Sequence, residues 1–505
     1  MFFFYNNLKE TRALVADCYR GESAIKDAAS RFGYLPPRRN EAEEEEKFRG
    51  DAKAFTEYRN RLSYATYENF FRATIDDIVG LMQRLAPTVA FDESDDANAP
   101  PEVVELNVYG NAQNDGFKGL KRRLNFDQTL YGRYGLLLDV VTDAEGLRPR
   151  FCISEYPALS ILDGESEGGR VGASRLRWAL LDESFLKFDP QTKRRDKIER
   201  WRVLGLDANG RYYQALLDGS ASAKWTTFDF AEPETTADSV VYPAFKGKTL
   251  DFIPFTVCNV DRLGIENWQE PPFSDVARVA IANYRVDSIY KRALWNFASP
   301  TLIVSNAKKI DGPVSLGGAL FLESGTSESA GASLLETSGS GLAELREAKT
   351  EIKEALKFTS IRDLLAGAGA NASERALALR ADSGTATVAA IDLAGGRAIE
   401  EQIVFAYVWA GASFEDAARN VKFEPNTSYL GDDFELSSVV QLLTANSAGG
   451  SKLLSDRQLY RLINKAAGGA LDSFEDNEEQ KIDEEPAPTP SVAQPRNVAY
   501  DWDIE

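Results

Sequence analysis

The sequence predicts an α+β fold, and three observations carry this prediction. Apolar residues recur at helical intervals over 48–85, short runs bounded by turn residues occupy 135–260, and a long helical pattern covers 271–300. The chain has 505 residues, of which 43% are hydrophobic. That is enough for a large core and two or more domains.

The first part of the chain reads as helical. Residues 1–45 predict a short helix followed by "YLPPRRNEAEEEE", where Pro36 and Pro37 bar a helix and the acids after them begin a new one. Residues 48–85 predict one or two packed helices, which Pro87 ends. "GLKRRLNFDQTLYGRY" (119–134) predicts a further helix.

Strand signals dominate the region from Gly135 to Val260. Brief apolar runs bounded by Gly, Asp, Asn or Pro predict strands; they are "GLLLDVV" (135–141), "RWALLD" (177–182), "ERWRVLGLD" (199–207), "RYYQALLD" (211–218), "KWTTFDF" (224–230) and "FIPFTVCNV" (252–260). The segment "DANGRYY" (207–213) reads as a hairpin connection.

A long helix is the strongest prediction after the strands. Pro271 and Pro272 precede it, Ser274 can cap it, Asp275 lies in its first turn, and Pro300 ends it. Two short strands, 301–309 and 317–324, come next, and then the flexible "GTSESAGAS" (325–333). A charged helix follows over 341–358, with its apolar side formed by Leu342, Leu345, Ile352 and Leu356.

Residues 373–411 predict a long helix that is broken or kinked near Gly384 and again at Gly395 and Gly396. Another helical region follows a loop rich in Asn and Asp. From Asp472 the chain is acidic and Pro-rich, which predicts a disordered tail unless a partner orders it.

Composition excludes several kinds of site. The sequence has no histidine and three widely spaced cysteines, Cys18, Cys152 and Cys258, which excludes zinc sites built on CxxC or HExxH and Ser/His/Asp or Cys/His triads. We expect the cysteines to be reduced, buried side chains. The net charge of −20 argues against tight gripping of nucleic acid, although not against a surface that DNA slides past.

The sequence shows neither a membrane-spanning pattern nor a signal-peptide pattern. No apolar stretch approaches the roughly 20 residues that span a bilayer, so we expect no membrane partner. The start "MFFFYNNLKE" has no cationic segment before its apolar run. We therefore expect no signal peptide and a chain that stays in the cytoplasm where it is made.

One glycine-rich segment imitates a dinucleotide-binding fingerprint. "LLAGAGANASERALALR" (364–380) places Gly367, Gly369 and Ala372 at G-x-G-x-x-A spacing, with Asp392 about two dozen residues on. The fingerprint needs a buried strand before its first glycine, and the preceding segment is charged at helical intervals instead. A Walker loop fails too, since Ala370 and Asn371 follow Gly369. We expect no cofactor.

Charged clusters allow weaker alternatives. Adjacent acids such as Asp76 with Asp77 could bind Mg²⁺, as could the pairs at 95–96 and 432–433, but neighbours on a helix point about 100° apart, which favours caps and solvated faces. The basic run "KRRDKIERWR" (193–202) could contact phosphate with Trp201 as a stacking platform. Its interspersed acids favour a solvated edge strand or hairpin.

The order of these features resembles the portal proteins of tailed bacteriophages. The matching segments run from about Tyr34 to Leu471, and their order rather than any one of them carries the likeness; they are "YLPPRRNEAEEEEKF", "YRNRLSYATYENFFRATIDDIVGLM", "LYGRYGLLLDV", "DFIPFTVCNV", "PPFSDVARVAIANYR", "ASPTLIV" and "ETSGSGLAELREAKTEI". The chain is most similar to a portal branch formerly described as a domain of unknown function.

The resemblance implies a subunit of a ring, usually of twelve copies, with the portal fold of wing, two-helix stem, clip, tunnel loop and helical crown. Carried onto this chain, the parts are an N-terminal arm 1–45, wing 46–264, first stem helix 265–299, clip 300–340, second stem helix 341–360, tunnel loop 361–375, kinked wing helix 376–412, crown 413–471 and acidic tail 472–505. The interrupting glycines at 384, 395 and 396 depart from the continuous wing helix that the family often keeps.

The resemblance also implies function and partners. A portal is the DNA channel at one capsid vertex of the virion, assembled in the host cytoplasm, and it is not an enzyme, because a separate terminase hydrolyses ATP and docks on the clip. Its partners would be double-stranded DNA, the terminase large subunit, a head-completion or adaptor protein, and the major capsid and scaffold proteins. The residues expected nearest DNA are those of the loop, Arg362, Gly367, Gly369, Asn371, Ser373 and Arg375, while Lys308 and Lys309 are the candidates for terminase docking on the clip.

Capping and solvation would equally explain the loop side chains: Asn371 or Ser373 could be a helix N-cap and Arg375 could pair with a nearby acid. Two other functions stay open for the whole chain. One is another head–tail connector protein, and the other is a metal-dependent hydrolase that uses carboxylates alone.

Overall fold

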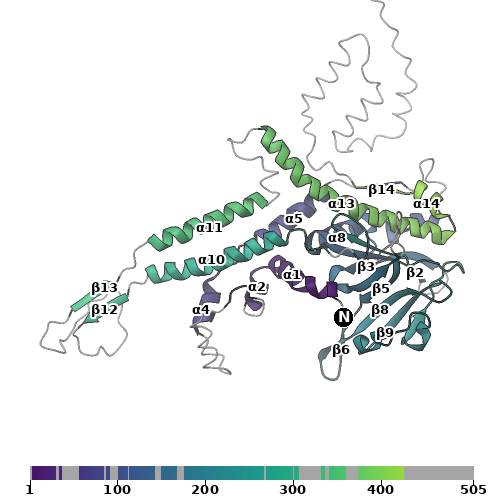
Figure 1. Cartoon of the computed structure of the whole chain (residues 1–505), viewed down its shortest axis with the longest axis horizontal. Helices are drawn as coiled ribbons and strands as arrows, with labels where there is room; N and C mark the ends of the chain where they lie inside the picture. The colour runs from purple at the N-terminus through teal and green to yellow at the C-terminus, as the bar shows by residue number, and fades with distance from the viewer. Residues whose placement is uncertain are drawn as a thin grey trace, which may run out of the picture. The chain divides into compact units, whose positions relative to one another are not determined.

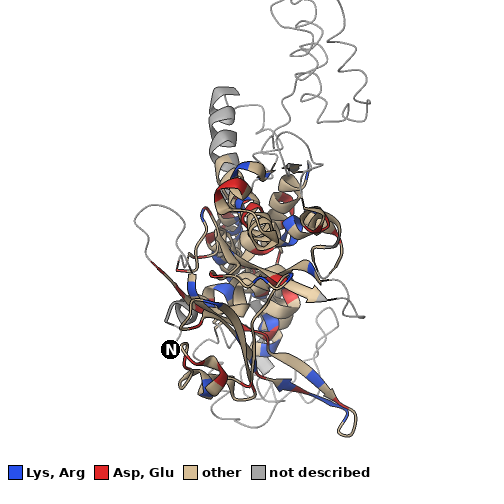
Figure 2. Cartoon of the chain, turned by 90° about the vertical axis from the view of Figure 1, so that its right-hand side faces the viewer, with Lys and Arg blue, Asp and Glu red and all other residues tan. Residues whose placement is uncertain are grey.

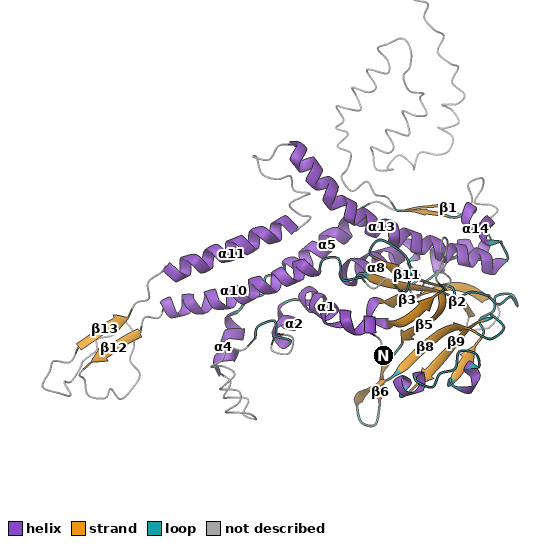
Figure 3. Ribbon diagram, in the orientation of Figure 1, coloured by secondary structure: helices purple, strands orange, loops and turns teal. Residues whose placement is uncertain are grey.

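The fold mixes α-helices and β-sheets, as the sequence predicts (Figure 1, Figure 3). The computed structural model describes residues 3–29, 33–36, 56–84, 87–90, 100–111, 113–142, 149–167, 176–266, 269–298, 301–305, 331–335, 340–359 and 374–425. These residues all belong to one unit, Met1–Pro425. The crown residues beyond 425 and the acidic tail lie outside the described part of the chain.

Helices form the first part of this unit. Helices α1 (Phe3–Arg20), α2 (Glu22–Asp27), α4 (Thr56–Tyr64) and α5 (Phe70–Met82) are followed by the short α6 (Pro101–Val104) and α7 (Leu106–Tyr109) and by α8 (Gly116–Tyr131). Helix α1 packs against α5, α8 and α10 (Ser274–Ala298), and buries Val15 and Cys18 there. The prediction of one or two helices over 48–85 is confirmed as two, while the acidic run 41–46 lies outside the described residues.

Two antiparallel sheets follow. Strands β2 (Arg133–Thr142), β3 (Pro149–Pro157) and β11 (Phe255–Asn259) form one sheet in the order β11-β2-β3. Strands β4 (Ile161–Ser166), β5 (Leu176–Asp182), β8 (Arg200–Leu206), β9 (Tyr212–Asp218) and β10 (Ser239–Val241) form the second, in the order β10-β9-β8-β5-β4. The 207–213 hairpin prediction is confirmed, since Asp207 accepts hydrogen bonds from the backbone of Asn209 and Arg211 in the β8–β9 turn.

The strand predicted at 224–230 is wrong. Residues Ala221–Trp225 form helix α9, and Pro233–Thr235 form a short 3-10 helix. The aromatic residues of this run instead supply rings that pack together over the five-stranded sheet: the centroid of Trp178 lies 5.3 Å from Trp225 and 5.5 Å from Phe230. The apolar run therefore forms a cap over the sheet rather than a strand within it.

Helix α13 (Glu374–Ala410) is one continuous helix, so of the predicted break or kink at its glycines the break is wrong and the kink stays a prediction. A β-carbon on Gly395 would lie 2.7 Å from Cδ2 of Leu124 and 2.8 Å from Oδ1 of Asn125, both on α8. A β-carbon on Gly396 would lie 2.7 Å from Cδ of Pro425. These glycines let α8 and the end of the described chain approach the helix axis, which is a packing role rather than a hinge.

Gly395→Ala is expected to destabilise the fold by about 1–3 kcal/mol, because the new methyl group would enter a packed interface between α13 and α8. The matched control is Gly80→Ala near the end of α5, where nothing lies within 4 Å of the added carbon. That change should stabilise the fold by about 0.5–1 kcal/mol through helix propensity. Urea unfolding measures the change in stability for both variants. A change of the same sign in both would contradict the packing role of Gly395.

A small two-stranded sheet pairs the last described strand with the first. Strand β14 (Lys422–Glu424), after helix α14 (Phe414–Asn420), pairs with β1 (Thr88–Ala90). The main core lies where α8 and α13 cover the β11-β2-β3 sheet, with Leu136, Leu138 and Ile399 fully buried. Cys18 and Cys258 are buried free thiols, as expected, and Cys152 is a half-buried one.

The long helix predicted at 271–300 is confirmed as α10, and helix α11 (Ser340–Thr359) lies beside it (Figure 1). Ser274 is the first residue of α10 rather than its N-cap. The backbone N–H of Ala277 donates to the carbonyl of Phe273, so helical hydrogen bonding already begins one residue before Ser274. Between the two helices, β12 (Thr301–Ser305) pairs with β13 (Gly331–Leu335). The predicted partner strand at 317–324 lies outside the described residues, and part of the expected flexible segment is strand β13 instead.

Candidate functional site

The α10–α11 pair is the first feature with a geometry that suggests function. Both helices are long: α10 has 25 residues, so it spans roughly 37 Å at 1.5 Å per residue. The half-buried residues Leu342, Leu345 and Ile352 lie on one side of α11, as the sequence analysis expects for three of its four apolar positions. They form the side that packs against α10, because α11 makes its principal contacts with that helix.

A buried ion network fixes the two helices to each other. Asp287 of α10 is fully buried and accepts a hydrogen bond from the backbone of Thr66 at 3.0 Å. Its carboxylate also pairs with Lys349 of α11 and, at 3.1 Å, with Lys291. Burial raises the pKa of Asp287, but the hydrogen bonds from Lys349, Thr66 and Lys291 outweigh burial and leave that pKa below its usual value.

Glu68, in the loop between α4 and α5, extends this network. Its carboxylate lies 3.1 Å from Nζ of Lys349 and 2.8 Å from Nζ of Lys353. Sequence reasoning missed Glu68, Asp287 and Lys349. The available signal was the spacing of Lys349 and Lys353, which puts two cations one turn apart on the side of α11 that also carries Ile352.

The opposite side of α11 carries an acidic stripe. The four residues are exposed and follow one another at intervals of three, four and three, which places them along one helix face; they are Glu344, Glu347, Glu351 and Glu354. Among the ion pairs found in the described part of the chain, none involves these four carboxylates. The stripe is therefore a continuous negative surface alongside the helical pair.

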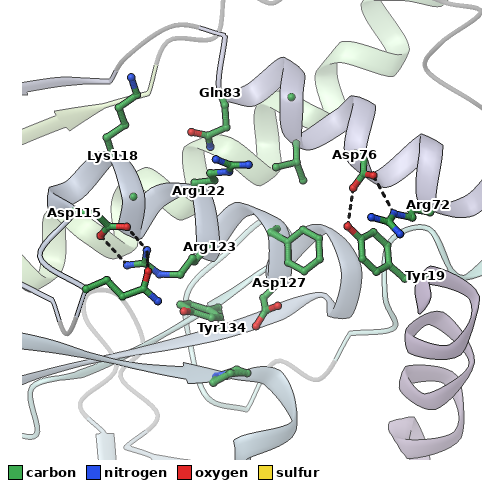
Figure 4. Close-up of a pocket in the computed structure, with 16 residues that line it drawn as sticks. Tyr19, Arg72, Asp76, Gln83, Asp115, Lys118, Arg122, Arg123, Asp127 and Tyr134 are labelled. Carbon is green, nitrogen blue, oxygen red and sulfur yellow. Dashed lines mark hydrogen bonds and ion pairs between the residues drawn. The ribbon is translucent and has the colours of Figure 1, made fainter. Parts of the chain in front are cut away.

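A groove of about 1150 Å³ lies between α5 and α8 (Figure 4). Its charged side chains are mostly paired. Asp76 accepts a hydrogen bond from the hydroxyl of Tyr19 at 2.7 Å and pairs with Arg72 at 3.4 Å. Arg123 pairs with Asp115 and, at 2.7 Å, with Glu155.

One acid in the groove is unusual. Burial, and then the negative charge of Glu155, raise the pKa of Asp127 to about 7. Glu155 itself accepts hydrogen bonds from Arg123 and from the hydroxyl of Tyr134 at 2.6 Å. Asp127 is thus the group here that changes charge near neutral pH, while its neighbours hold structural ion pairs.

Asp127→Asn is expected to stabilise the fold at pH 8 by about 1–2 kcal/mol and to have little effect at pH 4. The folded pKa lies above the unfolded one, so the unfolded chain gives up its proton first. The wild type accordingly loses stability as pH rises from about 4 to 7. Urea unfolding across this range measures the difference, with the exposed Asp27→Asn as the control; parallel profiles for both variants would contradict the assignment.

The sequence-predicted loop and clip residues lie almost entirely outside the described residues. Arg362, Gly367, Gly369, Asn371 and Ser373 fall within 360–373, and Lys308 and Lys309 fall within 306–330. Arg375 lies in the first turn of α13. The loop and clip assignments therefore stay predictions.

The other predicted residues have clear positions. Asp392, read as a possible ribose carboxylate, is fully buried on α13, where it pairs with Lys121 at 2.6 Å and accepts a hydrogen bond from Asn125 at 2.8 Å. Trp201 is buried within the sheet and cannot be a stacking platform. Residues Phe185–Asp189 (β6) and Arg194–Ile198 (β7) form an exposed hairpin, one of the two forms that the sequence favours for the basic run, while the last residues of the run lie in β8.

Metal sites and membrane spans are both absent from the described residues. Within those ranges, His, Cys, Asp and Glu side chains form no group of three that could hold a metal ion. None of the helices in the same ranges combines the length and apolar character of a membrane span. Of the acid pairs proposed for Mg²⁺, Asp76 and Asp77 alone are described, and Asp76 is engaged with Tyr19 and Arg72.

Comparisons with known proteins find structural likeness only. No family model and no curated protein matches the sequence. The fold is similar to a chain from the neck of an empty gene transfer agent particle computed with C6 symmetry, with 14% identity, a TM-score of 0.38, and coverage of 79% of this chain and 90% of that one. It is also similar to a chain from the virion of a native gene transfer agent particle, with 14% identity, a TM-score of 0.37 and the same coverage of both chains.

Proposed function

We propose that the chain is a portal protein, a ring subunit that forms the DNA channel at one capsid vertex and serves as the docking platform for terminase and head-completion proteins. The observation that carries the proposal is the α10–α11 pair. Two long helices are held rigidly by the buried Asp287 network, and the outer face of α11 carries four exposed carboxylates. Together with the ordered series of portal-like motifs, this supports a stem that lines a tunnel.

The chemistry of the acidic stripe suits DNA passage. A channel wall must not bind the duplex tightly, since each neutralised phosphate would add affinity and slow sliding. Carboxylates repel phosphates over a Debye length of about 8 Å at physiological salt. The stripe of Glu344, Glu347, Glu351 and Glu354 would then reduce friction, and the net charge of −20 has the same sign.

The loop 361–375 and the clip complete the proposal. The loop connects the end of α11 at Thr359 to the start of α13 at Glu374, so it would be the tunnel loop, with Arg362, Asn371, Ser373 and Arg375 touching phosphates transiently. Lys308 and Lys309, between β12 and β13, would contact terminase. Replacing Gly367 and Gly369 with proline should leave the ring assembled and impair packaging; unchanged packaging would make the loop an ordinary connector.

The deciding experiment has two parts. Mass measurement and axial electron-microscope images of the purified assembly should show a ring with an opening wide enough for duplex DNA, and a chain that stays monomeric even with scaffold protein would overturn the proposal. A ring with a closed or narrower opening would favour another head–tail connector. Replacing the four stripe glutamates with glutamine should then tighten duplex binding by the ring.

The matched control for the stripe variant changes four exposed acids elsewhere to their amides, which removes the same charge without touching α11. Suitable positions, each exposed, are Glu10, Asp27, Glu105 and Asp251. The stripe variant should bind duplex DNA more tightly than this control. Equal affinities would show that net charge matters and the position of the stripe does not.

A further inference from the structure

The β6–β7 hairpin is an exposed structure with two different kinds of side chain. It leaves the five-stranded sheet after β5, and its turn is held by Asp189, which accepts hydrogen bonds from the backbone of Gln191 at 2.9 Å and the hydroxyl of Thr192 at 2.8 Å. Leu186 is 61% exposed and Phe188 is 53% exposed. An isolated two-stranded hairpin is marginally stable in water, so exposure of large apolar side chains on one indicates a partner.

Cations share a face with these apolar side chains. Leu186 stands opposite Lys197, and Phe188 stands opposite Arg195, so all four point to the same side of the hairpin. Residues 185–198 carry five cations and two acids in a chain whose net charge is −20. Figure 2 shows Lys and Arg gathered on this hairpin at the lower end of the view. The face is apolar at its centre and positive around it.

A cleft with the opposite character lies at the other end of β5. It has a volume of about 610 Å³ and an apolar lining that includes Leu176, Phe252 and Phe414. The ring of Phe252 lies 5.1 Å from that of Phe405 and 4.9 Å from that of Phe414, which is 41% exposed. The cleft is therefore an aromatic pocket that is open to solvent among the described residues.

Acids line and flank this cleft. Glu401 accepts a hydrogen bond from Thr256 at 2.6 Å, and Glu400 accepts one from the backbone of Phe423 at 3.0 Å, so both carboxylates are fixed in the lining. The exposed Glu415 directly follows Phe414 in sequence. Arg397 is the cation of the lining. Acids outnumber cations here, which complements the hairpin.

The two surfaces lie at opposite ends of β5 within one copy of the chain. Leu176, in the cleft, begins β5, and Leu186 follows the other end of the same strand, ten residues later. At about 3.3 Å per residue, β5 alone separates its two ends by about 20 Å. A contact between them must join two copies and must be head-to-tail, and such contacts close into rings when the rotation permits.

We propose that the β6–β7 hairpin of one copy inserts Leu186 and Phe188 into the Phe252–Phe405–Phe414 cleft of the next copy, with Arg195 and Lys197 facing its acids. This inference rests on the proposed ring function and names the contact between neighbouring subunits. DNA fits the hairpin less well, because a phosphate backbone offers nothing to Leu186 and Phe188, and the net charge of −20 repels it. Protein interfaces, in contrast, combine aromatic anchors with arginine.

A cross-linking experiment tests the contact in the full-length chain. In a Cys152→Ser background, Leu186→Cys combined with Phe414→Cys should give a ladder of covalent oligomers under oxidising, non-reducing conditions, while each single variant gives none. The control pair, Leu186→Cys with Ile289→Cys, places the second thiol on the exposed side of α10 and should also give none. Disulfide-linked peptides from the ladder should join positions 186 and 414. Cross-linking of the double variant that is no greater than that of the single variants would overturn the proposal.

Measuring the affinity between subunits tests how much this contact contributes to their association. Leu186→Ser with Phe188→Ser should weaken subunit association about 30-fold or more, as expected for central apolar anchors. Arg195→Glu with Lys197→Glu should weaken it too, without removing any apolar group. Val104→Ser with Val108→Ser, which alters exposed apolar side chains elsewhere, should have little effect.

The outcomes separate this contact from the proposed function. A wild-type chain that forms no ring would overturn the portal proposal and this contact together. A wild-type ring that the hairpin variants form equally well would overturn the contact alone. A disulfide between Phe414→Cys and a cysteine introduced within 168–175 or 426–505 of the same chain would likewise overturn it, by assigning the cleft to another occupant.

Discussion

Replacing Lys121 with methionine is expected to lower the free energy of unfolding by about 3–5 kcal/mol, one of the two largest single effects that we predict for this chain. Lys121 is 1% exposed on α8 and pairs at 2.6 Å with Asp392 of α13, which is fully buried. Its Nζ also donates to the carbonyl of Met82 at the end of α5, at 3.3 Å. One ammonium group thus joins three helices, and its loss would remove this ion pair from the buried carboxylate of Asp392.

The control for this prediction lies one turn earlier on the same helix. Lys118 is exposed beside the groove, so Lys118→Met should change stability by less than about 0.5 kcal/mol. The double variant Lys121→Met with Asp392→Leu should recover most of the loss, since apolar groups often replace a buried ion pair without cost. Urea unfolding at one fixed protein concentration measures all three, and equal losses for Lys118→Met and Lys121→Met would contradict the assignment.

Asp287→Ala is the second large effect, with an expected loss of about 3–5 kcal/mol. The substitution leaves Lys349 and the backbone amide of Thr66 without their buried acceptor, and it removes the principal charge link between α10 and α11. The wild-type network should also weaken in acid. Because the folded pKa lies below the unfolded one, its contribution is present above the unfolded pKa and is lost as pH falls through the folded pKa.

Asp275→Ala is the matched control on the same helix. Its carboxylate also pairs with a cation, Arg278 at 2.8 Å, but its side chain is 86% exposed. Exposed pairs contribute little, so we expect a change below about 1 kcal/mol. Unfolding curves monitored by circular dichroism compare the variants, and a small loss for Asp287→Ala would mean that water reaches the network and replaces the lost acceptor.

Much of the secondary structure was predictable because its causes are local. The 274–298 helix, the two helices of 56–82 and the 207–213 hairpin each follow from apolar spacing and from turn or capping residues within the segment itself. The strand predicted at 224–230 is wrong because a brief apolar run fits a cap of aromatic rings over a sheet as well as it fits a strand. The break predicted at Gly395 is wrong because this glycine is required by close packing against Leu124, more than 250 residues away in the sequence.

The candidate site divides in the same way. The sequence alone determined the acidic stripe on α11, since a helix fixes the spacing of Glu344, Glu347, Glu351 and Glu354 whatever surrounds it. For the basic run near Arg194 it favoured a solvated edge strand or a hairpin, and the structure shows a hairpin. Only the tertiary structure decided that Asp392 neutralises Lys121, that Asp287 links two helices, and that the hairpin and the aromatic cleft lie at opposite ends of one strand. Those facts depend on contacts between segments that are far apart in the sequence. The groups that surround a buried charge or an exposed phenylalanine are decided only when the chain folds.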